Sequence, residues 1–254
     1  MRRETLMKRA LKIVVVVSGV LIMCGCGPRK SAVRRGGETL GTGSAGPFVP
    51  SSYIARPTLS AGSQYPNLLS PESYTIWFTD EVAEVKVELE KAEGKAPADS
   101  EELLRIAKQL NGKYLILECH VVSAFPDSSI AYDITSFRHA EAFLMDDAGN
   151  KCEPLQVIIG SLERGNKGAL REFRRVNLLV FPKNDLITGE PIINSHLRNI
   201  SLAISGYKTT YFFSWKDTTR TAQPQRLEQD TRSIGAVSLG MLESALRFLV
   251  EDFK

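Results

Sequence analysis

The sequence has little of what most catalytic and metal sites are built from. It contains four cysteines and three histidines in 254 residues. The histidines (His120, His139 and His196) lie far apart, and no CxxC, HExxH or GxSxG pattern occurs. Such patterns hold zinc ligands, or a nucleophile near its partners, at the spacing that the chemistry requires. We therefore expect no cofactor and no metal, although catalytic residues can also assemble from distant positions.

Three short motifs resemble known sites but lack an essential part. Residues 41–46 match GxGxxG but lie in a glycine-rich stretch without the flanking strand and helix of a dinucleotide site. Residues 160–167 are a near miss to a P-loop, with the lysine displaced by one position. His139-Ala140-Glu141 has the HxE form of zinc deaminases without the later PCxxC. None of the three motifs predicts a nucleotide or zinc site.

The cluster Asp146, Asp147 and Asn150 offers oxygen atoms that could bind calcium. Its spacing lacks the ligand number of a dedicated calcium loop. Aspartate, asparagine and glycine are also the residues that favour tight turns. We interpret the cluster as a turn.

The N-terminus has the organisation of an export signal. Basic residues (Arg2, Arg3, Lys8, Arg9 and Lys12) precede an apolar run from Ile13 to Met23. This run is shorter than the roughly 20 apolar residues of a membrane-spanning helix. A basic region followed by an apolar region of this length is typical of a secretory signal peptide.

The signal ends in Met23-Cys24-Gly25-Cys26, which resembles the lipobox of bacterial lipoproteins. The resemblance implies cleavage before the cysteine and attachment of acyl chains such as palmitate to it. Cys26 follows a small residue, as the family pattern requires, whereas Cys24 follows methionine and is the alternative. Two or more acyl chains anchor a protein stably. The resemblance thus implies a lipid-anchored envelope protein; because no aspartate follows Cys26, the outer membrane facing the periplasm is favoured over the inner membrane.

The basic character of the chain belongs to its N-terminal part. The whole chain carries a formal charge of +3, and the signal peptide alone holds five basic residues against one acid. The remainder is therefore mildly acidic, which argues against nucleic acid as a partner.

The composition divides the chain into four parts. Residues 1–25 form the signal peptide, and residues 26–72, rich in Gly, Ser and Pro, are expected to be a disordered tether. Residues 73–217 are expected to be the β-domain, and residues 218–254 a polar linker and a helix. Cys119 and Cys152 fall within the β-domain, where they form either one disulfide or two separate thiols.

The β-domain is expected to be an antiparallel β-sandwich with one inserted helix, because short alternating runs separated by turn residues dominate it. Its strand succession resembles that of immunoglobulin-like sandwiches. The inserted helix starts at the N-cap Ser100 and stops at Asn111-Gly112. The expected strands include residues 74–78, 83–90, 114–122, 130–134, 140–145, 155–159, 176–181, 200–204 and 209–215. Residues 140–145 and 155–159 are expected to form a hairpin.

The C-terminal segment from Ser233 to Phe253 is expected to be an amphipathic helix with a wide apolar face. It either packs on the sandwich or binds a protein partner. The face that would meet a partner consists of Ile234, Val237, Met241, Ala245 and Phe248.

These observations favour a non-enzymatic envelope protein that binds a partner protein or takes part in an envelope assembly. One alternative is a carbohydrate- or small-ligand-binding sandwich that presents the aromatic side chains of Tyr207, Tyr211, Phe212, Phe213 and Trp215. The other alternative is an envelope hydrolase whose catalytic residues come from dispersed positions.

Overall fold

A computed structural model of the chain describes residues 48–63, 68–95, 99–123, 125, 127–167, 170–185, 189–193, 197–206, 208–217, 231, 233–237 and 239–252. All of them belong to one compact unit, residues 44–254. The signal peptide, Cys24 and Cys26, the GxGxxG stretch, His196 and Tyr207 lie outside the described residues.

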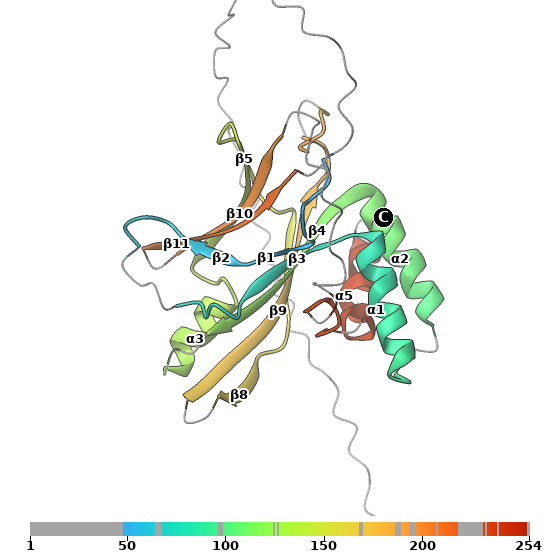
Figure 1. The fold of residues 1–254 in the computed structure, drawn as a ribbon, viewed down its shortest axis with the longest axis horizontal. Helices are drawn as coiled ribbons and strands as arrows, with labels where there is room; N and C mark the ends of the chain where they lie inside the picture. Colours follow the sequence, from blue (N-terminus) through green and yellow to red (C-terminus); the bar gives the residue numbers. More distant parts are fainter. Residues whose placement is uncertain are drawn as a thin grey trace, which may run out of the picture. The chain divides into compact units, whose positions relative to one another are not determined.

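Two antiparallel sheets form the framework (Figure 1). Sheet 1 has the order β1-β3-β4-β9-β7, with β8 pairing further along β9; sheet 2 has the order β2-β11-β10-β5-β6. The strands of sheet 1 are β1 (Ile54–Ala55), β3 (Tyr74–Phe78), β4 (Tyr114–Ser123), β7 (Gln156–Ile159), β8 (Glu163–Lys167) and β9 (Leu170–Pro182). The strands of sheet 2 are β2 (Pro57–Leu59), β5 (Ala140–Asp146), β6 (Lys151–Cys152), β10 (Asn199–Gly206) and β11 (Thr209–Lys216). The expectation of a mainly β protein with two antiparallel sheets is confirmed.

The described helices are α1 (Asp80–Ala92), α2 (Ser100–Lys113), α3 (Ser128–Thr135) and α5 (Leu239–Asp252). Figure 1 shows α1, α2 and α5 grouped on one side of sheet 1. One apolar core lies between the two sheets, and a second lies between sheet 1 and these three helices. Sheet 1 is therefore a middle layer, which explains why β4 is buried on both of its faces.

Two predicted strands are helices. Val82, Ala83, Lys86, Val87 and Glu90 are the buried residues of α1, a helical spacing that coexists with the alternation seen in the sequence. The Thr79 hydroxyl caps α1 by accepting from Val82 N–H. Likewise, residues 130–134 lie in α3, and Asp127 caps it by accepting from the backbone of Ser129 and Ile130.

Helix and tether boundaries also differ from the predicted ones. The N-cap of α2 is Asp99 rather than Ser100, and the helix runs past Asn111-Gly112 to Lys113. Part of the predicted tether is built into the domain, because β1 pairs with β3 in sheet 1 and β2 pairs with β11 in sheet 2. Apolar packing accounts for this: Tyr53 and Ala55 are buried in the core.

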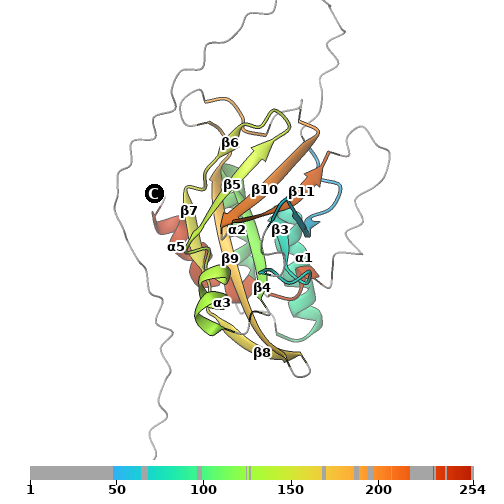
Figure 2. The ribbon, with the colours of Figure 1, turned by 90° about the vertical axis from the view of Figure 1, so that its left-hand side faces the viewer.

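The predicted hairpin of residues 140–145 and 155–159 is wrong in its second strand. The Asp146–Asn150 turn, with Gly149 at a positive φ of 81°, returns the chain to the short strand β6, which pairs with β5. The chain then crosses to sheet 1, where β7 pairs with β9. Figure 2 shows β6 beside the upper end of β5, and β7 alongside β9.

Candidate functional site

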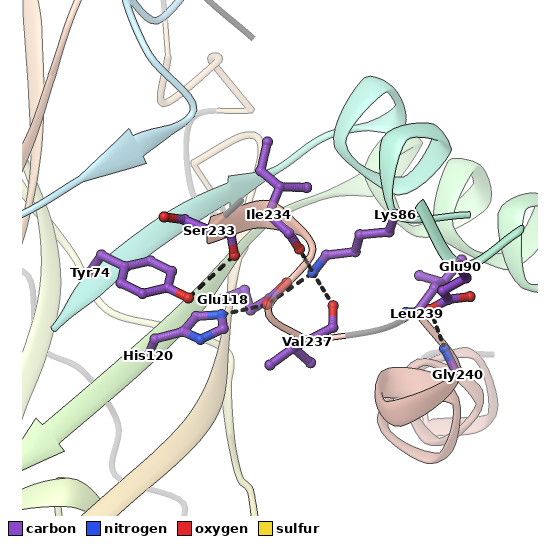
Figure 3. Close-up of polar contacts among 10 residues, drawn as sticks. All are labelled: Tyr74, Lys86, Glu90, Glu118, His120, Ser233, Ile234, Val237, Leu239 and Gly240. Atoms are coloured by element: carbon purple, nitrogen blue, oxygen red, sulfur yellow. Dashed lines mark hydrogen bonds and ion pairs between the residues drawn. The ribbon is translucent and has the colours of Figure 1, made fainter. Parts of the chain in front are cut away.

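A buried polar cluster joins α1, β4 and the C-terminal segment (Figure 3). Lys86 projects from α1 and Glu118 from β4, and both side chains are 0 % exposed. The Lys86 ammonium donates to Glu118 Oε1 at 3.2 Å and to the carbonyls of Ile234 and Val237 at 2.7 and 2.6 Å. An ammonium group has three protons. All three therefore have acceptors, and two of the acceptors are backbone atoms of the C-terminal segment.

His120 and Tyr74 extend the cluster along the sheet. His120 Nε2 lies 2.6 Å from Glu118 Oε1, and the imidazole stacks on the Tyr74 ring with centroids 4.2 Å apart. The Tyr74 hydroxyl donates to the Ser233 carbonyl at 3.2 Å. Burial raises the pKa of Tyr74, and the Glu118 charge raises it further. The phenol is therefore a neutral hydrogen-bond donor.

Glu90, one turn after Lys86 on α1, binds the start of α5, just after the turn that Lys86 binds. Its carboxylate accepts from the backbone N–H groups of Leu239 and Gly240 at the start of α5. The first N–H groups of a helix have no partner within the helix, and a carboxylate there is favourable. Figure 3 shows Glu90 reaching the first turn of α5 while Lys86 reaches the preceding turn.

Electrostatics keep Glu118 ionised within the cluster. Burial by itself would raise the pKa of Glu118, but the Lys86 charge and the hydrogen bond and charge of His120 lower it below the ordinary value. A fully buried carboxylate that its neighbours keep ionised is a poor general base because it is stabilised and inaccessible. Its evident role is to hold Lys86 and His120.

The C-terminal residues predicted to form a possible partner surface differ in how deeply they are buried. Ile234 and Val237 are buried in the core between sheet 1 and the helices, so these two side chains pack on the domain, which is one of the two alternatives that the sequence left open. Their carbonyls bind Lys86, so the segment is turned inward there. Ala245 and Phe248 are half-buried on α5, and the side chain of Met241 lies outside the described part. The expected single helix is interrupted: Ser233 and Ile234 are helical, residues 235–237 form a turn, and α5 begins at Leu239 with its leucines packed in the same core.

The remaining candidates have structural roles. Cys119 is a buried free thiol in sheet 1 and Cys152 a half-buried free thiol in sheet 2, so the disulfide alternative is not realised. The carboxylate of Asp146 accepts from Asn150, and that of Asp147 accepts from the backbone of Arg198 and Asn199, as turn residues do. The aromatic side chains of Tyr211, Phe213 and Trp215 are buried between the sheets, and Phe212 is half-buried.

An open hollow lies where β5 and β7 face one another at the edges of their sheets. Its volume is about 550 Å³, within the range of ligand-binding clefts. Ala140 and Ala142 of β5 and Val157 of β7 pack toward the inter-sheet core beside it. Ile159, at its rim, is 49 % exposed, and Leu155, which precedes β7, is 39 % exposed. The full lining is Ser136, Phe137, Arg138, Ala140, Glu141, Ala142, Phe143, Lys151, Glu153, Pro154, Val157 and Ile159. Sequence reasoning missed the hollow, because its prediction paired β5 with β7.

Among the described residues, no group of three or more metal-binding side chains occurs. No described helix has the length and apolar character needed to cross a membrane. Comparison with protein-family models, with curated proteins and with solved structures finds no match for this chain.

Proposed function

We propose that this protein is a lipid-anchored envelope protein without enzymatic activity, which binds a protein partner through the hollow between β5 and β7. One observation carries the proposal. Within the buried cluster, Lys86 and Glu90 are bound to the protein's own backbone, whereas the accessible hollow combines an apolar floor with an open sheet edge. Such a surface is suited to binding rather than to acid–base chemistry.

The anchor rests on the sequence alone. Cys26, with Cys24 as the alternative, would carry the acyl chains. Mass spectrometry of the mature protein should find an acylated N-terminal Cys26, and a Cys26→Ser variant should leave the membrane fraction. An unmodified N-terminus at another residue would contradict the anchor. An immunoglobulin-like identity for the two sheets stays a prediction.

The binding role is tested by photo-crosslinking in the native cells. A photoreactive amino acid replaces Ile159 at the hollow or, as the matched control, Leu59, which is 43 % exposed on β2 at the opposite edge of sheet 2. We expect a discrete adduct from position 159 and none from position 59. No adduct from position 159, or identical adducts from both positions, would contradict the proposal.

A carbohydrate-binding role receives less support. The aromatic side chains that would form the platform, Tyr211, Phe213 and Trp215, are buried in the inter-sheet core. We therefore keep the protein partner as the proposal.

A further inference from the structure

The outer edge of β5 is paired over only part of its length. On one side, β5 pairs with β10 throughout; on the other, β6 pairs with only Leu144 and Met145. After Cys152 the chain leaves for sheet 1. No strand of the described residues pairs with Ala140–Phe143 on the side away from β10. The hollow lies where a continuation of β6 would run.

The backbone groups at this edge can be identified from the alternation of the strand. Asp146 N–H donates to Asn150 O, and Asp146 O accepts from Gly149 N–H, so the polar groups of Asp146 face the β6 side. Since successive residues of a strand point their N–H and C=O groups to opposite sides, those of Ala142 face this side too. Ala142 therefore offers one donor and one acceptor to an incoming strand.

The side chains around this edge specify what fits beside it. Ala140 and Ala142 are small, whereas Leu144, further along β5, is large and buried. The small side chains leave room at the inner face, where Val157 and Ile159 supply apolar contacts. An added strand with an apolar residue at every second position would place these residues over the hollow.

The rim of the hollow carries both positive and negative side chains, and these differ in whether they already contact another charged or aromatic group. Lys151 Nζ lies 4.1 Å over the centroid of the Phe143 ring, and Arg138 Nη1 lies 4.0 Å from Asp133 Oδ1. The two cations thus already have partners. Glu141 and Glu153 are exposed and form no ion pair within the described part of the chain. Asp133 offsets the Arg138 charge, but the Phe143 ring does not cancel that of Lys151, so the rim holds two carboxylates against one ammonium and is negative by one charge.

We propose that the partner adds an extended segment as a strand beside Ala140–Phe143, with alternating apolar residues facing the hollow and basic residues meeting Glu141 and Glu153. This inference rests on the proposed binding function and names its mode. Main-chain hydrogen bonds supply affinity in such strand addition, and alternate side chains supply specificity. Open sheet edges readily pair with another chain.

The test uses a capped, fluorescent heptapeptide of alternating valine and threonine with a lysine at each end. Its binding to the full-length chain in detergent is followed by fluorescence anisotropy. We expect saturable binding, about tenfold weaker binding of the same peptide with glutamate ends, and no binding when alternate backbone nitrogens are methylated. Equal binding of the lysine- and glutamate-ended peptides, or binding of the methylated peptide, would overturn the inference.

Variants of the chain locate the site. The double variant Glu141→Lys/Glu153→Lys should prefer the glutamate-ended peptide, whereas Glu251→Lys, an exposed acid on α5, should keep the original preference. Ala142→Pro removes the open N–H without removing a bond to β10, and should abolish binding. If Ala142→Pro does not fold, as judged by circular dichroism, the charge-reversed variant decides alone, and an unchanged preference there refutes the site.

The two proposals can fail separately. An adduct from position 159 without peptide discrimination would leave the binding function standing and remove strand addition. Peptide discrimination without any adduct in cells would retain the edge as a strand-binding site and remove the proposed partner in the envelope.

Discussion

Lys86 and Glu90 lie four residues apart on α1. Lys86 binds the turn that precedes α5, and Glu90 binds the first residues of α5. Lys86 donates to the carbonyls of Ile234 and Val237, and Glu90 accepts from the N–H groups that begin α5. An i,i+4 pair of opposite charge usually stabilises its own helix on the surface. Here each charge instead binds backbone groups that another segment leaves without partners.

Replacing Lys86 by methionine should destabilise the protein by about 3–5 kcal/mol, because Glu118 would remain buried without its cation. The free energy of unfolding in urea measures the loss. Lys91→Met is the matched control on the same helix, since Lys91 forms an exposed pair with Glu88 and such pairs contribute about 0–1 kcal/mol. The double variant Lys86→Met/Glu118→Leu should recover much of the lost stability. Equal unfolding free energies for the two single lysine variants would contradict this account.

Removing the Glu90 carboxylate should loosen the start of α5 while leaving α1 folded. Glu90→Gln keeps the size of the side chain but weakens a charge-assisted bond, and we expect a loss of about 1–2 kcal/mol. Amide hydrogen exchange should accelerate at Leu239 and Gly240 more than at Val87. Uniform acceleration across the domain would instead indicate that Glu90 contributes only global stability.

Acid should weaken the cluster through Glu118. Because the folded-state pKa of Glu118 is lowered below its ordinary value of 4.5, the carboxylate contributes stability that is fully present above that value. This stability is lost as the pH falls through the folded-state pKa. The unfolding free energy of the wild type should therefore fall on acidification below pH 4.5, and that of Glu118→Gln should fall less over the same range. Parallel curves for the two proteins would show that Glu118 does not carry this dependence.

The two described cysteines should both be free thiols in the native protein. Burial raises the pKa of Cys119 to about 12 and that of Cys152 to about 11. Because the thiolate is the reactive form, alkylation in the native state should be slow at Cys152 and slower at Cys119. Mass mapping without reductant measures both thiols, and a Cys119–Cys152 disulfide would contradict the structure.

The sequence predicted the sheets better than the helices that cover them. Alternation correctly located β4, β10 and β11, because one face of each strand packs in the inter-sheet core. The same alternation misled at residues 83–90, where charged side chains at 86 and 90 suggested a wet face although both are buried. The cap Thr79, followed by Asp80 and Glu81, was the available signal for a helix start.

The candidate site was harder to predict, since it depends on contacts between distant segments. Glu118 was one sign: a charge within the mainly apolar strand β4 requires a buried partner. Its partner Lys86 lies 32 positions away, and the carbonyls that complete the cluster lie 148 and 151 positions from Lys86. Side-chain pattern carries no information on such backbone acceptors. The open edge of β5 was equally hidden, because it arises from the crossing of the chain between sheets after Cys152.

Photo-crosslinking from position 159, repeated in the Glu141→Lys/Glu153→Lys background, tests the central claim most directly. It asks in the native cells whether a partner occupies the hollow and whether the rim charge selects it. We predict a discrete adduct in the otherwise unaltered chain that is lost in the charge-reversed chain and kept in the Glu251→Lys control. An adduct of undiminished yield in the charge-reversed chain, or no adduct in any of the three, would contradict the account.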